Sequence, residues 1–397
     1  MRVETPFNRP FIAGRELFYI AQAVTLGNLG GDGHFTRRCC RLLEDQFGIP
    51  RVLLTPSCTA ALELAALLCD LEPGDEVIVP SYTFVSTANA IIRAGAKPVF
   101  VDIRPDTLNL DERLIEAAIG ARTKAIFPVH YAGVSCEMDV ILEIAEAHHL
   151  KVVEDAAQAV YSSYREKPLG SLGHLGTFSF HETKNYISGE GGALCVNDTS
   201  LLDRAEILRD KGTNRQRFLR GEVKKYEWVD VGSSFVPSEL VGAFLFGQLE
   251  EMEHIADRRR AIYLYYKERL AEFQDLGVLR CPVVPQHCYS NYHLFYILLP
   301  SRRVRDAMES YLAEQGVQAI THFEPLHTSP MGKRLGYRDG QLPITESVAG
   351  RILRLPLFYD ITAAQQDHVV DSIGRFFSSR SFEGSEIARS GVSAVIE

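Results

Sequence analysis

Residues 176–185 read Gly-Thr-Phe-Ser-Phe-His-Glu-Thr-Lys-Asn, and residues 189–192 read Gly-Glu-Gly-Gly. An apolar, β-prone run therefore ends near Lys184, and a glycine-rich turn leads into a second apolar run over residues 193–196. A lysine at the end of a buried strand can lose its proton and become a nucleophilic amine. An isolated lysine would by default be a solvated surface residue, so this interpretation needs a chemical partner elsewhere in the sequence.

That partner is an acid at the end of another strand. Residues 152–158 read Val-Val-Glu-Asp-Ala-Ala-Gln, so a buried-type run ends at Asp155. A carboxylate is the partner that a pyridinium nitrogen requires, and a lysine amine holds pyridoxal 5′-phosphate (PLP) covalently. The two strand ends therefore predict a PLP site, in which Lys184 also moves a proton as general base and acid.

These motifs together resemble those of the DegT/StrS-type sugar aminotransferases, over about residues 6–377. The resemblance implies fold-type I: a large α/β domain with a mainly parallel seven-stranded sheet and a smaller C-terminal α/β domain. It also implies a homodimer whose active sites are shared between chains. Within the family, the sequence is most similar to the transaminases that make dTDP-4-amino-4,6-dideoxygalactose for enterobacterial common antigen. Their substrates are the nucleotide sugar dTDP-4-keto-6-deoxy-D-glucose and the amino donor L-glutamate.

Other functions within this resemblance stay open. A transaminase acting at C3, or one giving the opposite configuration at C4, would carry the same motifs. A PLP-dependent sugar dehydratase is disfavoured, because those relatives have histidine where Lys184 stands. A PLP-binding regulator without enzymatic activity is the alternative from another class, and the intact Lys184 and Asp155 argue against it.

Composition and charge narrow the class of protein. The chain has 397 residues, which favours two domains. Its 42 Lys+Arg against 51 Asp+Glu give a net charge of −9, which argues against a nucleic-acid partner. Eight cysteines without a Cys-x-x-Cys pair indicate reduced thiols and a cytoplasmic protein. We find no signal sequence and no run of about 18 apolar residues, so we expect no membrane association.

A metal site is not expected. The densest group of potential ligands is Cys281, His287, Cys288 and His293. Its spacing fits no standard zinc pattern, so core and loop roles are favoured for these side chains.

Segments of strand and helix character alternate along the chain, which predicts right-handed crossovers and a parallel sheet. In such sheets ligands bind beyond the carboxyl ends of the strands. We expect a PLP-binding domain over residues 1–250, a long helix and small domain over 251–378, and a disordered tail over 379–397. Strands are predicted at 51–55, 76–80, 98–101, 125–129, 152–154, 293–299 and 317–320, and helices at 57–71, 84–93, 138–148, 201–212, 238–273, 303–315 and 363–377.

Nine residues are predicted to hold the cofactor. Small, hydroxyl-bearing residues at the start of the helix at 57–71 expose backbone N–H groups, and the helix dipole there favours an anion. The resemblance implies that this anion is the PLP phosphate, that an aromatic ring stacks over the cofactor, and that a small residue lies under it. The nine are Ser57, Cys58 and Thr59 at the helix start, Phe84 over the ring, Ala157 under it, Gln158 and Ser179 at the cofactor oxygens, Asp155 and Lys184.

Seven further residues are predicted to contact the substrate. Two follow a strand end, three lie in the basic loop over residues 213–225, and two lie in a segment that the resemblance places near the sugar. Arginine suits the diphosphate of a nucleotide sugar because it can make two contacts at once. The seven are His130, Tyr131, Arg215, Arg217, Arg220, His322 and His327.

One position departs from the family pattern. Many relatives have an asparagine, donated by the neighbouring subunit to the phosphate, at the position that corresponds to Val236. Valine cannot donate a hydrogen bond. Either Ser233, Ser234 or Ser238 replaces the asparagine, or the contact between subunits is absent.

Overall fold

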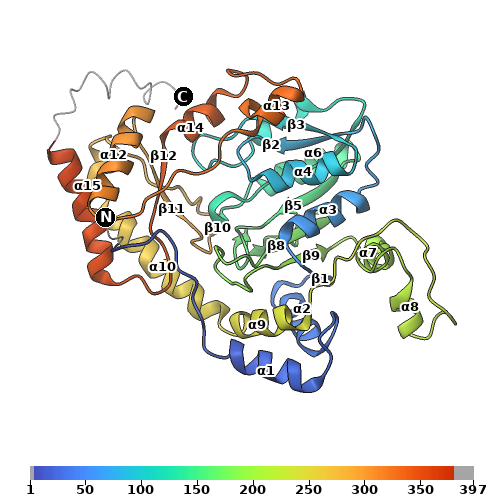
Figure 1. The fold of residues 1–397 in the computed structure, drawn as a ribbon. Coiled ribbons are helices and arrows are strands. Elements are labelled where there is room, and N and C mark those ends of the chain that lie inside the picture. The colour runs from blue at the N-terminus through green and yellow to red at the C-terminus, as the bar shows by residue number, and fades with distance from the viewer. Residues whose placement is uncertain (1–3, 380–397) are drawn as a thin grey trace.

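A seven-stranded sheet forms the centre of the fold, with the order β1-β9-β8-β5-β4-β2-β3 (Figure 1). The structure is a computed structural model that describes residues 4–379. Strand β9 pairs antiparallel with β1 and β8, and the other pairs are parallel, which confirms the predicted mainly parallel sheet. The strands are β1 (Arg51–Thr55), β2 (Glu76–Pro80), β3 (Lys97–Val101), β4 (Thr123–Ile126), β5 (Lys151–Asp155), β8 (Leu175–Ser179) and β9 (Gly192–Val196).

Helices cover both faces of this sheet, because alternate side chains of each strand point to opposite faces. Leu53 and Val153 belong to the apolar core on the face that carries α3 and α4. Val52 and Val152 belong to the core on the other face, against α2, α6 and α9. The helices are α2 (His34–Phe47), α3 (Cys58–Leu68), α4 (Val85–Arg93), α6 (Met138–Ala147) and α9 (Glu239–Leu249).

A smaller α/β layer follows in the C-terminal part, at the left of Figure 1. Its two strands pair antiparallel, and Ile297 and Leu353 lie in a core with side chains of the surrounding helices. The boundaries of the predicted domains stay a prediction. The elements are α10 (Met252–Arg269), α11 (Ala271–Asp275), β11 (Phe295–Leu298), α12 (Arg302–Glu314), α13 (Pro330–Arg334), α14 (Pro343–Arg351), β12 (Ile352–Leu355) and α15 (Ala363–Ser378).

Two predicted elements differ from the structure. The helix expected at 238–273 is divided into α9, α10 and α11, and the chain leaves helical geometry at Glu251. The break has a packing reason: α9 is buried beside the large sheet, whereas α10 packs on the C-terminal core. The strand expected at 317–320 is reduced to isolated bridges, from Val317 to Thr5 and from Ile320 to Arg354.

The amino-terminal segment connects the two parts of the molecule. Thr5 bridges to Val317, and the ring of Phe11 stacks on Tyr359 with the centroids 3.6 Å apart. The chain then forms α1, which packs against α9. An arm carrying α7 and α8 projects from the far side of the large sheet (Figure 1). These helices are α1 (Glu16–Leu26), α7 (Leu202–Arg209) and α8 (Arg215–Leu219).

The remaining elements are short. Apart from Ser379, the tail predicted to be disordered lies outside the described residues. Within residues 4–379, no helix is both long and apolar enough to cross a bilayer. The short elements are α5 (Ile115–Ala118), a small sheet of β6 (Ser163–Tyr164), β7 (Lys167–Pro168) and β10 (Cys288–Tyr289), and the 3-10 turns at Glu112–Leu114, Tyr131–Gly133, Thr199–Leu201 and Leu326–Thr328.

Candidate active site

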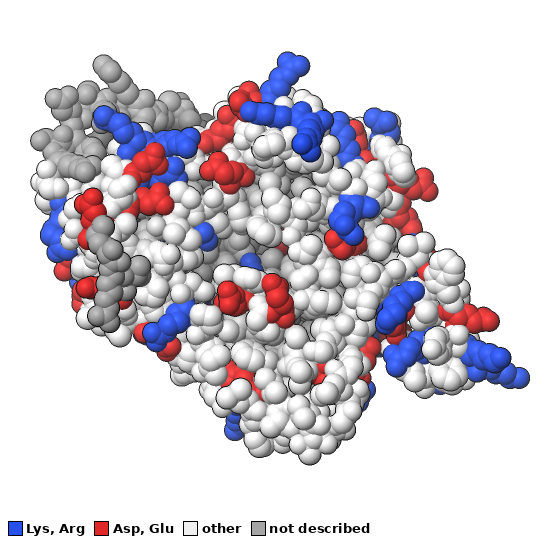
Figure 2. All heavy atoms as spheres, in the orientation of Figure 1, with Lys and Arg blue, Asp and Glu red and all other residues white. Residues whose placement is uncertain are grey.

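A cavity of about 630 Å³ opens beyond the carboxyl ends of the parallel strands, where the large sheet meets the C-terminal layer. Figure 2 shows this hollow near the middle of the molecule, with basic side chains visible inside it. Its size is typical of pockets for small molecules, roughly 300–1,000 Å³. The cavity is lined by all nine residues predicted to hold the cofactor: Ser57, Cys58, Thr59, Phe84, Asp155, Ala157, Gln158, Ser179 and Lys184.

Lys184 lies in the turn that follows β8, and its backbone N–H donates to the carbonyl of His181 at 2.9 Å. Its pKa is lowered, mainly because burial removes water from the ammonium group. The positive charge of Arg354 acts in the same direction, whereas Cys58 and Asp155 oppose it. The site thus favours a neutral amine, the form that acts as nucleophile and base.

Asp155, the last residue of β5, is buried and is held at both oxygens. Its Oδ2 accepts a hydrogen bond from Thr87 Oγ1 at 2.7 Å, and its Oδ1 accepts one from the backbone N–H of Ala157 at 3.1 Å. Thr87 lies on α4 and was not predicted as a site residue. Its only signal in the sequence was its position one helical turn after Phe84. The sequence does not show which strand end lies beside α4, because that depends on the tertiary structure.

The amino terminus of α3 faces the cavity beside Lys184. Ser57 caps the helix, with its Oγ accepting from the N–H of Ala60 at 3.1 Å, and Thr59 Oγ1 lies 2.7 Å from Ser86 Oγ. The first strand residue of β9, Gly192, packs directly on this turn. A Cβ atom at Gly192 would lie 2.4 Å from the backbone N of Cys58, so only glycine fits.

These groups fit PLP. A lysine amine with a lowered pKa, a buried carboxylate held by two donors and a helix amino terminus all line one cavity. Phe84 and the small Ala157 line it too, as required of groups on either side of a flat ring. The Oε1 of Gln158 is already engaged by the N–H of Ala132 at 2.7 Å, which leaves its amide N–H to face a ligand.

Two histidines that line the cavity have fixed surroundings. His322 Nδ1 lies 2.6 Å from the hydroxyl of Tyr131, and His293 Nδ1 lies 2.9 Å from Asn185 Oδ1. The Asn185 amide N–H donates to a carbonyl, so its oxygen accepts from His293. Burial lowers the pKa of both imidazoles, with the charges of Lys184 and Arg354 adding to the effect. Both rings are therefore neutral.

Of the seven predicted substrate residues, His322 alone lines the cavity. Tyr131 lies behind His322, to which its hydroxyl bonds. The prediction of direct contact is corrected for His130 and His327, which are fully buried with both ring nitrogens engaged by protein groups. His130 bonds Glu154 and the N–H of Cys136, and His327 bonds Ser81 and Glu346.

Sequence reasoning missed the residues that come from distant parts of the chain. The amino-terminal segment contributes two of them and α10 one, and the others lie on β12, just after it, and in the segments before β11 and α13. They carried no local signal, because each lies in an ordinary polar or apolar run. They are Phe7, Asn8, Arg259, His293, Leu294, Ile320, Phe323, Arg354, Leu355 and Leu357.

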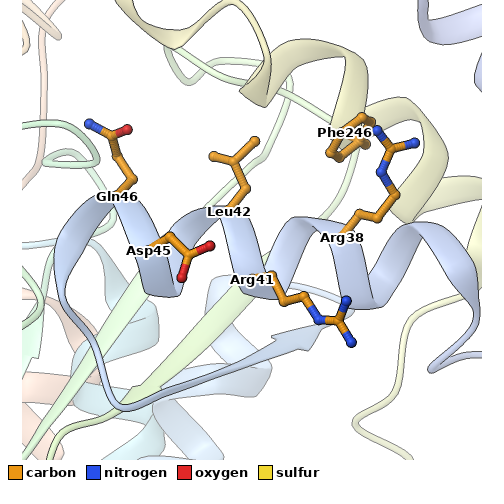
Figure 3. Close-up of a pocket in the computed structure, with 6 residues that line it drawn as sticks. All are labelled: Arg38, Arg41, Leu42, Asp45, Gln46 and Phe246. Atoms are coloured by element: carbon orange, nitrogen blue, oxygen red, sulfur yellow. The ribbon is translucent and has the colours of Figure 1, made fainter.

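Outside this cavity, the structure offers only weaker candidates for a ligand site among the described residues. A hollow of about 410 Å³ lies on the outer side of α2, and Figure 3 shows Arg38 extending over the ring of Phe246 there. The Arg38 Cζ is 3.8 Å from the ring centroid, and its Nη2 is 3.9 Å from Glu250, so its charge is already engaged. Among residues 4–379, no group of three or more His, Cys, Asp or Glu side chains is arranged to hold a metal ion.

Comparison with known proteins agrees with this geometry. The sequence model of the DegT/DnrJ/EryC1/StrS aminotransferase family matches residues 12–374. The chain belongs to this family. It is a sugar aminotransferase of the fold-type I class, and its cofactor is PLP.

Three members of the DegT/DnrJ/EryC1/StrS family illustrate the similarity. The spore coat polysaccharide biosynthesis protein SpsC of Bacillus subtilis is 34% identical, over 93% of this chain and 96% of SpsC. GDP-perosamine synthase of Caulobacter vibrioides is also 34% identical, over 92% and 96%. The PLP-form structure of Spr1654 from Streptococcus pneumoniae is 25% identical, with a TM-score of 0.85 and coverage of 97% and 99%.

The family match does not settle the role of the basic loop. Arg215, Arg217 and Arg220 lie on or beside α8, which is on the projecting arm in Figure 1, and none of them lines the cavity of its own chain. Each is paired with acids nearby: Arg215 with Asp210 at 3.2 Å, and Arg220 with Glu206 at 2.6 Å. These ion pairs lie within one chain, and the contact of these arginines with a substrate bound to the neighbouring chain stays a prediction.

The segment around Val236 is likewise outside this chain's cavity. Val236 packs against Gly31, where an added Cβ would collide with its side chain. Ser233, Ser234 and Ser238 are exposed. Their hydroxyls are free to face another chain of this aminotransferase, so the predicted replacement for the family's asparagine stays open.

Proposed function

We propose that this sugar aminotransferase transfers the amino group of L-glutamate to C4 of dTDP-4-keto-6-deoxy-D-glucose, giving dTDP-4-amino-4,6-dideoxy-D-galactose and 2-oxoglutarate. The observation that carries amino transfer is the arrangement of Lys184 and Asp155 in one cavity beside the amino terminus of α3. The choice of nucleotide sugar rests on the sequence resemblance. The names of SpsC and GDP-perosamine synthase agree with a role in cell-surface polysaccharide, for which enterobacterial common antigen is our specific proposal. We place the reaction in the cytoplasm.

When bound, PLP supplies an electron sink for the pair of electrons left when a C–H bond beside nitrogen is broken. Asp155 would keep the ring nitrogen of bound PLP protonated, and Thr87 and the Ala157 N–H hold that carboxylate in place. With PLP bound, Lys184 Nζ would accept the proton released from the substrate carbon and would later donate it back. Its lowered pKa makes the neutral amine, the form that carries the lone pair, easier to reach.

Product analysis tests the proposal. The purified protein is incubated with PLP, L-glutamate and, separately, dTDP-, UDP- and GDP-linked 4-keto-6-deoxyhexoses, and the products are identified by NMR. We expect the 4-amino-galacto product from the dTDP sugar. Amination at C3, the gluco configuration at C4, or preference for another nucleotide would replace this assignment with the corresponding alternative. A regulator without activity would leave the cofactor's absorption unchanged on addition of glutamate.

We further propose that the enzyme acts as a homodimer with shared sites. Apolar side chains are exposed on α1, where Leu17 is 75% exposed, and on the arm, where Trp228 is 79% exposed. Figure 2 shows that the surface over α1 is mostly uncharged. Such exposed apolar surface supports burial against a second chain. In the dimer, Arg215, Arg217 or Arg220 would reach a diphosphate bound over the partner's cavity.

Mixed dimers test the sharing of sites. A Lys184→Ala chain is co-expressed with a chain in which Arg215, Arg217 and Arg220 are all replaced by glutamine. Shared sites predict that the mixed dimer has one site with both lysine and arginines intact, so activity returns that neither parent shows. Mixed dimers that form and stay inactive would show that the arm serves its own chain or has no role in catalysis.

A further inference from the structure

The cavity contains a buried imidazole with one nitrogen that has no role in the reaction described so far. His293 lies in the segment before β11 and is 7% exposed. Its Nδ1–H donates to Asn185 Oδ1 at 2.9 Å, and the ring is neutral, so Nε2 carries a lone pair and no proton. Within residues 4–379, no group donates to this Nε2 in the structure. A buried acceptor that meets no donor is costly, so a donor is expected there in the working enzyme.

A chain of hydrogen bonds fixes the tautomer of His293. Asn185 Nδ2 donates to the carbonyl of Asn291 at 2.8 Å, so the amide oxygen of Asn185 faces the imidazole. The Asn291 amide is held in turn, because its Nδ2 donates to the carbonyls of Gln158 and Val160 at 2.9 and 2.8 Å. An amide donates only through its nitrogen, so Asn185 offers the imidazole an acceptor. The proton of His293 therefore stays on Nδ1.

A small recess adjoins the cavity at this imidazole. Its volume is about 10 Å³, which is close to the smallest space that holds one water molecule. Lys184 and His293 line both the recess and the main cavity. Ala157, which is predicted to lie under the cofactor ring, also lines both. An amine head group is about as large as a water molecule, so the recess is large enough for the Nζ of Lys184.

Three side chains that line the recess carry donors that no group in residues 4–379 engages. They are Gln158, Ser179 and Lys184. The first two are predicted to contact cofactor oxygens, which leaves the lysine for His293. The charge of Lys184 also acts on His293 more strongly than that of Arg259, although the Arg259 guanidinium donates to the His293 carbonyl at 2.7 Å. The lysine amine is therefore the donor best placed to reach Nε2.

Lys184 shows the complementary lack of a partner. Its Nζ makes no hydrogen bond or ion pair with any side chain in the described range 4–379, although burial lowers its pKa. As general base the amine takes up a proton and becomes an ammonium, which has three N–H donors and is costly in a desolvated site without an acceptor. No hydrogen bond joins Nζ to His293 Nε2 in the structure, so the contact requires the lysine side chain to turn into the recess.

We propose that His293 Nε2 accepts a hydrogen bond from Lys184 Nζ whenever this amine is not bonded to the cofactor. His293 is then a positioning residue that holds the general base beside the reacting carbon while the amine carries a proton. Asn185 is a second positioning residue, because it keeps Nε2 in the acceptor form. The inference goes beyond the proposed function, since it concerns the lysine of the aminotransferase and not the identity of the sugar.

Nitrogen-15 NMR of protein with labelled histidines tests the contact directly. The protein is prepared in the pyridoxamine phosphate form, in which Lys184 is free, and His293→Phe identifies the signals of His293. We expect a protonated Nδ1 and an Nε2 that is hydrogen-bonded as an acceptor. Lys184→Met should move the Nε2 signal to that of an unbonded imidazole nitrogen and change Nδ1 little. The signals of His322 are the control, because the charge of Lys184 acts on both imidazoles.

Two results of this experiment would overturn the proposal. An Nε2 signal of His293 that is the same with and without the lysine amine would exclude the hydrogen bond. A proton on Nε2 in the wild type would exclude the acceptor tautomer. Asn185→Leu provides an independent check, because loss of the amide oxygen should leave the proton shared between Nδ1 and Nε2. A tautomer that is unchanged in Asn185→Leu would remove Asn185 from the proposal.

Substitutions of His293 test the effect on proton transfer. His293→Phe removes the acceptor and should slow the single-turnover reaction with glutamate roughly tenfold to a hundredfold, as for loss of a hydrogen bond to a charged group. PLP affinity should stay within about threefold of the wild type. His293→Gln keeps an acceptor and should recover most of the rate. Wild-type rates in His293→Phe, or equally slow rates in both variants, would contradict the role of the acceptor.

His174→Phe is the matched control for the change of imidazole to phenyl. The Nδ1 of His174 also accepts a hydrogen bond, from the N–H of Val152 at 3.0 Å, and His174 does not line the cavity. This substitution should lower the free energy of unfolding without slowing the reaction with glutamate. The NMR test uses no keto-sugar, so its result is independent of the proposed function. An Nε2 signal that responds to Lys184→Met would support the positioning role even if the wild type aminated no keto-sugar.

Discussion

Replacing Thr87 by valine removes one hydroxyl group and nearly preserves the side-chain volume. Thr87 Oγ1 donates to Asp155 Oδ2 at 2.7 Å, and both side chains are buried. The other oxygen of Asp155 keeps its bond from the N–H of Ala157 at 3.1 Å. The substitution therefore leaves the carboxylate with one of its two hydrogen bonds, about which it can rotate.

The expected size follows from the charge on the acceptor. A hydrogen bond to a charged group contributes about 1.5–3 kcal/mol, more than a neutral one. We expect Thr87→Val to lower the free energy of unfolding by about this amount. Turnover should fall roughly tenfold to a hundredfold, because each 1.36 kcal/mol lost in the transition state is about a factor of ten. The reason is that Asp155 can then turn away from the cofactor nitrogen.

A double-mutant cycle isolates the Thr87–Asp155 interaction. Urea unfolding and single-turnover rates with glutamate are measured for Thr87→Val, Asp155→Asn and the double variant. Coupling of more than about 1 kcal/mol in both measurements is expected for groups in direct contact. Thr345→Val is the matched control, since its Oγ1 also donates to a carboxylate, Asp102 Oδ1, at 2.7 Å, and neither residue lines the cavity. It should cost stability without slowing the glutamate reaction. Additive effects of Thr87→Val and Asp155→Asn would refute this reasoning.

Four further substitutions probe the site. Lys184→Ala should lower turnover by several orders of magnitude while the fold is kept by circular dichroism, and near-normal turnover would remove Lys184 from catalysis. In the cofactor-free protein, Lys184→Met should raise the urea midpoint at pH 7. The pKa of the buried amine is lowered, so the unfolded chain binds the proton more readily than the folded chain, and the wild-type lysine costs stability there. The gain from the substitution should fade as the pH approaches 10.5, and a gain independent of pH would contradict this explanation. Asp155→Asn should still bind PLP but react with glutamate at least ~10²-fold more slowly, and an unchanged single-turnover rate would count against the ring-nitrogen role. Gly192→Ala should lower the free energy of unfolding by about 1–3 kcal/mol and weaken PLP binding, because the new Cβ meets the backbone of Cys58. Normal PLP affinity in this variant would show that the start of α3 adjusts to the added methyl group.

The part of the site that could be predicted from sequence is the part built from strand ends. Lys184 and Asp155 each end or follow an apolar run, and parallel strands bring such ends to one edge. Arg354 could not be found in this way, because it sits within an apolar run and reaches the cavity only through packing of the C-terminal layer.

The ion pairs of the arm could not be predicted from the sequence for a related reason. The basic residues of the loop stand out in the sequence, but the acids that pair with them are spread around it. Arg220 bonds Glu222 two positions later and Glu206 one helix earlier. Local charge therefore gave no sign of the counter-charges that the fold supplies in the same chain. His130 was misplaced because a strand end can also point into the core, here toward Glu154.

The strand order has a consequence for synthesis on the ribosome. Strand β1 has β9 as its neighbour in the large sheet, and Thr55 pairs with Gly192. At translation rates of about 5–20 residues per second, roughly 7–27 s pass between the emergence of these two residues. During that interval β1 is an apolar strand without its partner, which is the kind of edge that invites aggregation. We therefore expect nascent chains that stall before residue 192 to depend on chaperones more than chains that stall just after residue 196.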